Sequence, residues 1–127
     1  MINSKNRESK EMYLETILKE GMKKPQVHAV DIANAMGFTK PSVSIAMKNL
    51  REENFITIDE DSHIHLTEKG RALAESVYDR HRTFTKVIES LGVAPDIAEE
   101  DACRIEHFVS EETFEAIKRH AKEHGIL

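Results

Sequence analysis

The stretch FTKPSVSIAMKNLREENFITIDEDSHIHLT, residues 38–67, changes its hydrophobic period halfway along. In its first half, apolar residues recur at steps of three and four, which is the spacing of one helical face. In its second half, they alternate with polar residues on both sides of the acidic segment DEDS, a pattern typical of a two-stranded hairpin. We therefore predict a helix over residues 40–54, with Pro41 in its first turn, and a hairpin over residues 55–67.

Two further helices precede this stretch. The segment VHAVDIANAMG, residues 27–37, predicts a short helix that stops at Gly37 and turns three apolar side chains inward: Val30, Ala33 and Met36. Residues 8–21 predict an earlier helix that we expect to end at Gly21. A short helix, a tight turn, a second helix and a hairpin, in this order, make up a winged helix-turn-helix, whose second helix fits the major groove of DNA.

The residues expected to contact DNA lie at the start of the second helix and on its exposed face. Hydroxyl and lysine side chains there can reach phosphates and base edges, and Pro41 can pack on a thymine methyl group. A simpler interpretation is that Thr-x-Pro-Ser only begins a helix well, but the hairpin that comes after it favours DNA binding. His63 and His65 are expected to face solvent or to touch the DNA backbone. The predicted contacts are Thr39, Lys40, Pro41, Ser42, Ser44 and Lys48.

The chain after residue 67 is expected to be helical. Three helices are predicted there, over residues 67–92, 96–109 and 110–125. The fold class is therefore mainly α, with an N-terminal winged helix-turn-helix domain over residues 1–68 followed by a helical dimerisation domain over residues 69–127. The apolar faces of these helices exceed what one small lobe must bury, which predicts a dimer interface, although the same side chains could pack the lobe itself. The candidates are Val87, Ile88, Leu91, Phe108, Phe114 and Ile117.

The composition excludes several classes of protein. The net charge of −5 argues against a nucleic-acid binder, but the acidic excess lies after residue 70 and leaves the first half about neutral. No apolar run approaches the roughly 20 residues of a membrane span, and the polar start shows no signal peptide, so we expect a cytoplasmic protein with no membrane partner. A single cysteine forms no intramolecular disulfide, which fits a reducing compartment.

The segment DACRIEHFVS, residues 101–110, contains the only cysteine of the chain. On a helix, Cys103, Glu106 and His107 share one face because they are three and four residues apart. Thiolate, carboxylate and imidazole together suit a first-row divalent transition metal rather than Mg²⁺ or Ca²⁺. Three ligands rarely suffice, so we expect others from elsewhere in the chain, with three candidates: His81, Met12 and Glu15.

Two other interpretations of this cluster remain open. A cysteine on an apolar helix face is usually part of the core, and a Glu–His pair is usually on the surface. Cys103 and His107 could also form a thiol–imidazole pair, but no oxyanion-hole loop or glycine-rich substrate turn accompanies them. We therefore expect neither enzyme activity nor a small-molecule substrate.

Five segments of the chain carry a family resemblance: EMYLETIL, IANAMGFTKPSVSIAMKNL, LTEKGRALA, the RHR of residues 80–82, and DACRIEHFVS. In combination they resemble the iron-dependent repressor family, the group of the diphtheria toxin repressor and the manganese transport regulator. The resemblance covers nearly the whole chain and implies a metal-activated transcriptional repressor. It also implies a homodimer that binds double-stranded operator DNA and controls metal-uptake genes, with the metal bridging the winged-helix and dimerisation domains.

The resemblance further implies which residues bind metal. The primary, DNA-activating site of the family corresponds to four residues: Met12, Cys103, Glu106 and His107. His81 matches a ligand of a second, ancillary metal, and Glu15 matches an acidic ligand of manganese-type members. At two other ancillary positions, Thr85 stands in place of a glutamate and Glu99 in place of a histidine, so that only Glu99 retains a ligating group.

The types of donor atom bear on which metal binds. Thioether and thiolate ligands favour Fe(II), whereas Mn(II) prefers oxygen and nitrogen, so Met12 and Cys103 predict an iron-responsive repressor. A Mn(II)-responsive repressor is the alternative within the family, and Co(II), Ni(II) or Zn(II) can bind the same ligands in vitro. A metal-independent winged helix regulator is a further alternative, but it leaves the cluster around Cys103 unexplained. A metal-storage protein with no role on DNA leaves the segment TKPSVS and the hairpin unexplained.

Overall fold

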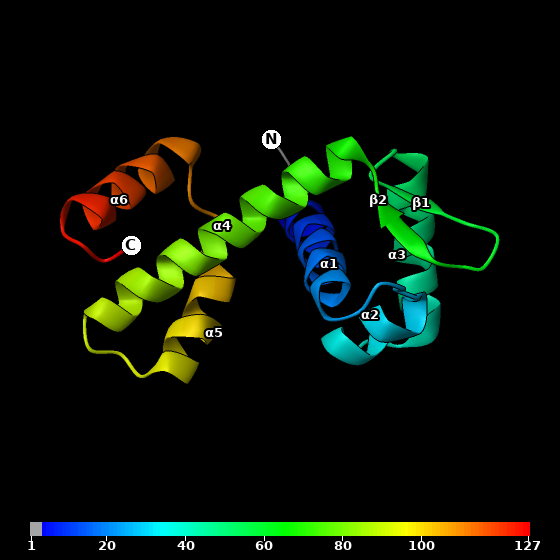
Figure 1. Ribbon diagram of the computed structural model, residues 1–127, viewed down its shortest axis with the longest axis horizontal. Helices are drawn as coiled ribbons and strands as arrows, with labels where there is room; N and C mark the ends of the chain where they lie inside the picture. Colours follow the sequence, from blue (N-terminus) through cyan, green and yellow to red (C-terminus); the bar gives the residue numbers. More distant parts are fainter. Residues whose placement is uncertain (1–3) are drawn as a thin grey trace. The chain divides into compact units, whose positions relative to one another are not determined.

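The computed structural model describes residues 4–127, with side chains from residue 8 onward. Its elements run in the order α1 (Ser4–Lys23), α2 (Ala29–Met36), α3 (Lys40–Glu52), β1 (Ile56–Ile58), β2 (Ile64–Leu66), α4 (Glu68–Ser90), α5 (Pro95–Ile105) and α6 (Glu111–Glu123) (Figure 1). The chain forms two compact units that divide between Glu75 and Ser76, inside α4. None of the helices described combines the length and the apolar character that a bilayer-spanning segment requires. The predicted fold class, mainly α with a winged helix-turn-helix at the N-terminal end, is confirmed.

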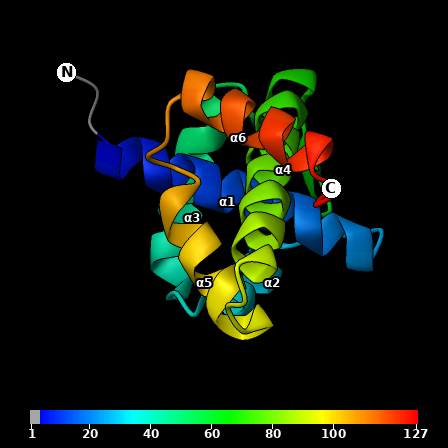
Figure 2. The ribbon, with the colours of Figure 1, turned by 90° about the vertical axis from the view of Figure 1, so that its left-hand side faces the viewer.

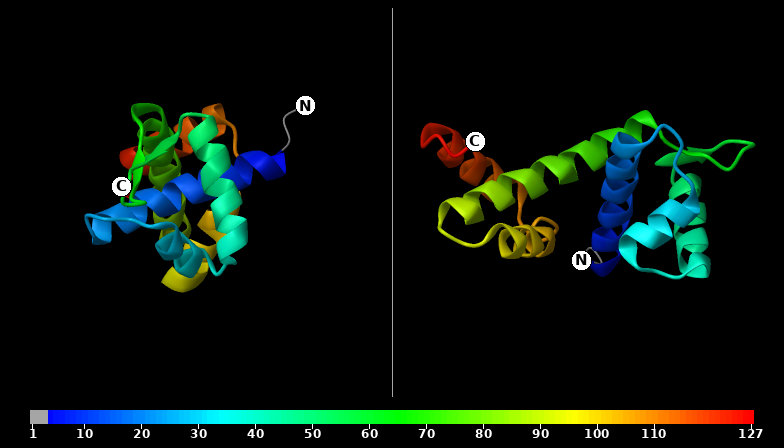
Figure 3. Two further views of the ribbon diagram at one scale, coloured as in Figure 1. Left: turned by 90° about the vertical axis from the view of Figure 1, so that its right-hand side faces the viewer. Right: turned by 60° about the horizontal axis from the view of Figure 1, so that its bottom comes forward.

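In the first unit, α1, α2 and α3 pack around one apolar core, and the hairpin joins them (Figure 3). Leu14 of α1, Ile32 of α2, Val43 of α3 and Ile56 of β1 are each at most 1% exposed. Because apolar side chains from four elements fill the same core, the three helices and the hairpin stabilise one another.

Helix α3 begins as the sequence predicts. The Thr39 hydroxyl oxygen accepts a hydrogen bond from the Ser42 backbone N–H at 3.3 Å, and Pro41 occupies the first turn, where its missing N–H costs nothing. The inner face of α3 is formed by three buried side chains: Val43, Met47 and Leu50. The opposite face of the helix therefore points away from the core of the unit.

The hairpin also forms where it is predicted, with β1 and β2 antiparallel and Thr57 paired with His65. Asp59 organises the turn, because its Oδ1 accepts hydrogen bonds from the backbone N–H groups of Asp61 at 2.9 Å and His63 at 3.0 Å. The other oxygen, Oδ2, lies 2.9 Å from Nε2 of His65. The hydrogen bond with His65, together with the weaker effect of the His63 backbone, lowers the pKa of Asp59 from 3.8 to about 2.

Two expectations about the first unit are wrong. Helix α1 does not end at Gly21 but continues to Lys23, and Pro25 lies just beyond this end, where it disfavours helical backbone in the residue before it. Val30 does not face inward, since its side chain is 41% exposed; the inward positions of α2 belong instead to Ile32 and its neighbour in sequence.

In the second unit, α4, α5 and α6 pack around an aromatic core (Figure 2). The ring centroids of Phe84 in α4 and Phe114 in α6 lie 5.7 Å apart. Ala102 of α5 is fully buried in the same cluster, where its small side chain lets the helix approach the rings closely.

Helix α5 ends at Ile105, earlier than the predicted residue 109, and residues 106–108 form a turn. The reason is a buried arginine in α4. Nη1 of Arg80 donates hydrogen bonds to the carbonyl oxygens of Glu106 at 3.1 Å and Val109 at 2.7 Å. Because the guanidinium satisfies these carbonyl groups, the chain can leave the helix at this point without burying unpaired acceptors.

The six apolar residues predicted for a dimer interface differ in how far they are buried. Phe114 belongs to the core of the second unit, and Ile88 and Ile117 pack against that core, so the alternative interpretation holds for these three. Val87 is half-buried. The most exposed members are Leu91 and Phe108, at 76% and 59%. These two side chains are therefore the part of the predicted surface that is left for a partner.

Gly70, at the start of α4, is a position where a side chain should not be tolerated. A Cβ atom on residue 70 would lie 1.9 Å from the backbone carbonyl oxygen of Phe55. We expect Gly70→Ala to lower the free energy of unfolding by about 3 kcal/mol, because two backbone segments would have to separate. Gly21→Ala is the matched control: it lies inside α1 with no atom within 4 Å of the added Cβ, and it should raise stability by up to about 1 kcal/mol. Urea unfolding of both variants tests this, and a Gly70→Ala protein as stable as the wild type would contradict it.

The hydrogen bonds in the hairpin turn lead us to expect that the Asp59 carboxyl group titrates at an unusually low pH. The folded pKa of Asp59 lies below its usual 3.8, so the contact stabilises the hairpin above that pH and is lost as the pH falls through about 2. Carbon-13 NMR of the Asp59 carboxyl group should show a midpoint of about 2 in the wild type, and His65→Ala should move the midpoint up toward 3.8. His120→Ala, in α6, is the control and should leave it unchanged. An unaltered midpoint in His65→Ala would show that the hydrogen bond does not form in solution.

Candidate metal centre and nucleic-acid interface

Three ionisable side chains of the second unit lie close together and are buried. His81 comes from α4, whereas Glu106 and His107 come from the turn after α5, and all three are at most 7% exposed. Nδ1 of His81 lies 2.8 Å from Oε2 of Glu106, and Nε2 of His107 lies 3.3 Å from Oε1 of Glu106. The two oxygens of one buried carboxylate are therefore each next to a different imidazole.

This arrangement fits a divalent transition metal. A buried carboxylate is costly unless donors or positive charge compensate it, and Oε1 of Glu106 accepts no hydrogen bond from any described residue. Ligand atoms about 2.1 Å from a metal lie roughly 3 Å apart in octahedral coordination, which is close to the separations in this cluster. Carboxylate oxygen and imidazole nitrogen are both ligands that such ions accept.

The other ligands predicted in the second unit differ in how well they are placed. Cys103 is half-buried, and it keeps its helical spacing to Glu106, whose backbone still has helical dihedral angles (φ −59°, ψ −25°). Glu99 has an oxygen 3.9 Å from Nε2 of His81, with its side chain 68% exposed. Thr85 donates its hydroxyl hydrogen to the His81 carbonyl at 2.7 Å, so this side chain is committed to the helix backbone and does not join the cluster.

The remaining predicted ligands, Met12 and Glu15, lie on α1 in the first unit. Met12 is half-buried, and its carbonyl oxygen accepts a hydrogen bond from the Thr16 hydroxyl at 2.8 Å. Glu15 is 4% exposed, with one oxygen 3.8 Å from Nζ of Lys19. Their part in metal binding stays a prediction.

Arg80 is the functional residue that sequence reasoning missed. It is 7% exposed, and besides its two carbonyl acceptors it forms an ion pair with Glu111 at 2.8 Å and lies over the ring of Phe114. These contacts fix the turn that carries Glu106 and His107. The segment RHR gave no local signal for it, because Arg80 and Arg82 stand in the same charged stretch of α4 and only the structure shows that Arg80 is buried while Arg82 is exposed.

The six residues predicted to contact DNA are all exposed at the start and on the outer face of α3. The hydroxyl group of Thr39 donates to Oγ of Ser42 at 2.9 Å, so these two side chains also cap the helix. The tip of the hairpin exposes acidic side chains, and Lys48 and Arg51 of α3 line the same groove as Ser62 of the hairpin turn. Arg51 was not predicted, although it lies three residues after Lys48 and hence on the same side of the helix.

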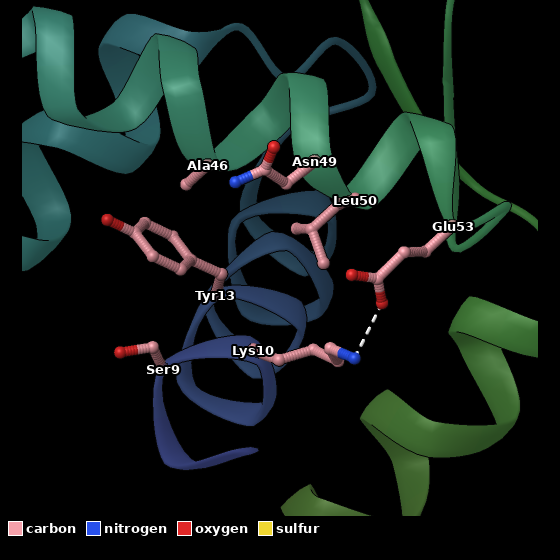
Figure 4. Close-up of a pocket in the computed structure, with 7 residues that line it drawn as sticks. All are labelled: Ser9, Lys10, Tyr13, Ala46, Asn49, Leu50 and Glu53. Carbon is pink, nitrogen blue, oxygen red and sulfur yellow. Dashed lines mark ion pairs between the residues drawn. The ribbon is translucent and has the colours of Figure 1, made fainter. Parts of the chain in front are cut away.

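A groove flanks α3 on each side. One, of about 470 Å³, lies toward α2 and the hairpin and is lined by residues that include Ser44, Lys48 and Arg51. The other, of about 320 Å³, lies between α1 and α3, where Figure 4 shows the Lys10–Glu53 ion pair beside it. The outer line of α3 therefore stands out as a ridge between two depressions.

A sequence model described as "Iron dependent repressor, metal binding and dimerisation domain" matches residues 67–123. The transcriptional regulator MntR of Salmonella typhimurium is 34% identical over 100 residues, which cover 79% of this chain and 64% of MntR. The iron-dependent repressor IdeR of Mycobacterium tuberculosis is 33% identical over 106 residues, covering 80% of this chain and 45% of IdeR. This chain thus spans under two thirds of the length of these two relatives.

A relative of similar length is the uncharacterized HTH-type transcriptional regulator MJ0568 of Methanocaldococcus jannaschii, which is 30% identical over 115 residues, or 87% of this chain and 90% of the relative. Among solved structures, the manganese regulator SloR superposes with a TM-score of 0.78 at 30% identity, covering 89% of this chain and 53% of SloR. The metal-dependent transcriptional regulator MtsR superposes with a TM-score of 0.81 at 27% identity, covering 89% and 53%. The names of these proteins describe regulators of transcription and not enzymes.

Proposed function

This chain belongs to the iron-dependent repressor family, and on that basis we propose that it is a metal-activated repressor of transcription. In this proposal a homodimer binds operator DNA in the cytoplasm when the metal site is filled and controls genes of metal uptake. The family match to a metal-binding and dimerisation domain supports metal binding and dimerisation as the role of the second half of the chain. The winged helix-turn-helix of the first unit supports DNA as the partner.

The observation that carries the proposal is the buried carboxylate of Glu106 between two imidazoles. A bound cation would supply the positive charge that this carboxylate lacks and would accept nitrogen donors from His81 and His107. Arg80 holds the turn that presents two of these groups, so their positions are set before any metal arrives. We also assign Cys103 and Glu99 to the ligand set, from the same unit.

Two further ligands, Met12 and Glu15, are proposed from α1 on the strength of the family resemblance. If α1 contributes to the same metal as the second unit, metal binding couples the DNA-binding unit to the dimerisation unit. Moving a two-state equilibrium from 1:99 to 99:1 requires about 5.5 kcal/mol of preferential binding, which a multidentate transition-metal site can provide. The coupling matters because two recognition helices of a dimer must reach successive major grooves about 34 Å apart.

Fe(II) is the metal that we propose, because a thioether from Met12 and a thiolate from Cys103 suit iron better than manganese. Mn(II) is the second candidate, and a specific observation favours it. The donors that lie closest together in the second unit, those of His81, Glu106 and His107, are all nitrogen and oxygen, which Mn(II) prefers. Co(II), Ni(II) and Zn(II) can occupy such a site in vitro whichever metal acts in the cell.

Anaerobic titration of the metal-free protein with Fe²⁺ and with Mn²⁺ tests the proposal. DNA binding is read by fluorescence anisotropy of a labelled duplex, selected by the metal-loaded protein from a random-sequence pool, at one fixed salt concentration. Activation at lower Fe²⁺ than Mn²⁺ would establish the iron sensor, and the reverse order would establish the manganese sensor. Equal DNA affinity with and without metal would refute the regulatory role of the site.

Substitutions of single ligands should show which donor atoms each metal requires. We expect His107→Ala to raise the concentration of either metal needed for half-maximal DNA binding by at least about 100-fold, since even the indirect partners of metal ligands contribute 10- to 100-fold. Cys103→Ala should impair activation by Fe²⁺ much more than activation by Mn²⁺, because only iron gains from the thiolate.

His120→Ala, on the exposed surface of α6, is the matched control and should behave as the wild type. Circular dichroism establishes that each variant is folded. A His107→Ala protein that responds at the wild-type metal concentration would show that the ligand set is wrong.

A further inference from the structure

The outer face of α3 carries a large apolar side chain at its centre. Ile45 is 63% exposed, although every other large aliphatic side chain of this helix is buried. At 100° per residue, position 45 points almost directly away from the core-facing line of Val43, Met47 and Leu50. Ile45 therefore lies on the crest of the ridge between the two grooves that flank α3.

The residues around Ile45 on the helix surface are of the types that contact DNA bases and phosphates. Pro41 lies one turn earlier on the same outer line, and Lys48 and Asn49 lie one turn later. Thr39 and Ser42 are hydrogen-bonded to each other in the helix cap, so part of their hydrogen-bonding capacity is not available to DNA. The crest at the second turn of α3 is thus apolar, with polar groups on both of its flanks.

The stability of the fold does not explain why an isoleucine stands at position 45. A side chain that is 63% exposed buries little apolar area, and a β-branched residue has a slightly lower helix propensity than alanine. The same branching restricts Ile45 to essentially one χ1 rotamer in a helix, so its γ-methyl group occupies a fixed position before any partner arrives. A rigid apolar group costs little entropy on binding.

We propose that Ile45 is a specificity-determining residue, which packs against the C5-methyl group of a thymine in the major groove of the operator. This inference rests on the proposed function, because it assigns a base to one residue of the proposed DNA-binding helix. In the major groove only T·A pairs present a methyl group, and apolar side chains distinguish them by contact with it. Lys48, on the flank of the same crest, is suited to a phosphate, which fixes the register without reading sequence.

Replacing thymine by deoxyuracil tests the inference, because it removes the C5-methyl group and leaves base pairing intact. The full-length, metal-loaded protein is titrated into its selected duplex and into a series in which each thymine in turn, with its symmetry mate, is replaced. We expect one of these replacements to raise the dissociation constant of the wild-type protein by about fourfold per half-site. This is the change that corresponds to the transfer free energy of one buried methyl group. In Ile45→Ala the same replacement should have no effect, whereas Ile45→Val should retain part of it.

Met22→Ala is the matched control, since Met22 is 60% exposed in the same unit but lies at the end of α1. It should show the same deoxyuracil profile as the wild type. Metal-activated binding with identical deoxyuracil profiles in the wild type and Ile45→Ala would overturn this inference and leave the proposed function standing. If the metal-loaded protein selects no sequence from the random pool, the proposed function fails, and this inference fails with it.

Discussion

The carboxylate of Glu106 is the constraint around which the second unit is arranged. It is completely buried, and burying such a group is costly unless donors or positive charge surround it. The chain supplies an imidazole from α4, 25 residues away, and another from the adjacent residue, while the guanidinium of Arg80 fixes the intervening turn. Helix α4 must therefore lie against the end of α5. The requirement that determines this packing also assembles the donor atoms for a cation, so the stability of the unit and its proposed metal response share one origin.

The first unit meets a different requirement, which is to hold one helix rigidly while leaving its outer face exposed. The core contacts of α3 and its Thr39 cap define the helix without using that outer face. Its stability is consequently independent of Ile45, and this residue is available for recognition. In the same unit, the tip of the hairpin is negatively charged, and hydrogen bonds to the Asp59 carboxylate fix its conformation. Attraction to DNA phosphates is therefore left mainly to the lysine and arginine side chains of α3.

Donor chemistry links the chain to both branches of its family. The comparisons include proteins named as iron-dependent and as manganese regulators, with similar identity to this chain. The family alone therefore does not select a metal. Within the chain, sulfur donors at Met12 and Cys103 favour iron, while the nitrogen and oxygen donors brought together in the second unit are those that Mn(II) prefers and that Fe(II) also accepts. The identity of the metal thus depends on whether the sulfur atoms take part.

Local patterns in the chain were enough to predict the order of the elements, the start of α3, the hairpin and the residues exposed on α3, because periodicity and capping act over a few residues. They also identified Cys103, Glu106 and His107 as candidates, since their spacing is local as well. Tertiary contacts, in contrast, end α5 at Ile105 and bring Glu106 to His81. They also place Ile32 and not Val30 against the core. These outcomes depend on residues far apart in the sequence, and no local pattern records which distant group will satisfy a buried carboxylate or carbonyl.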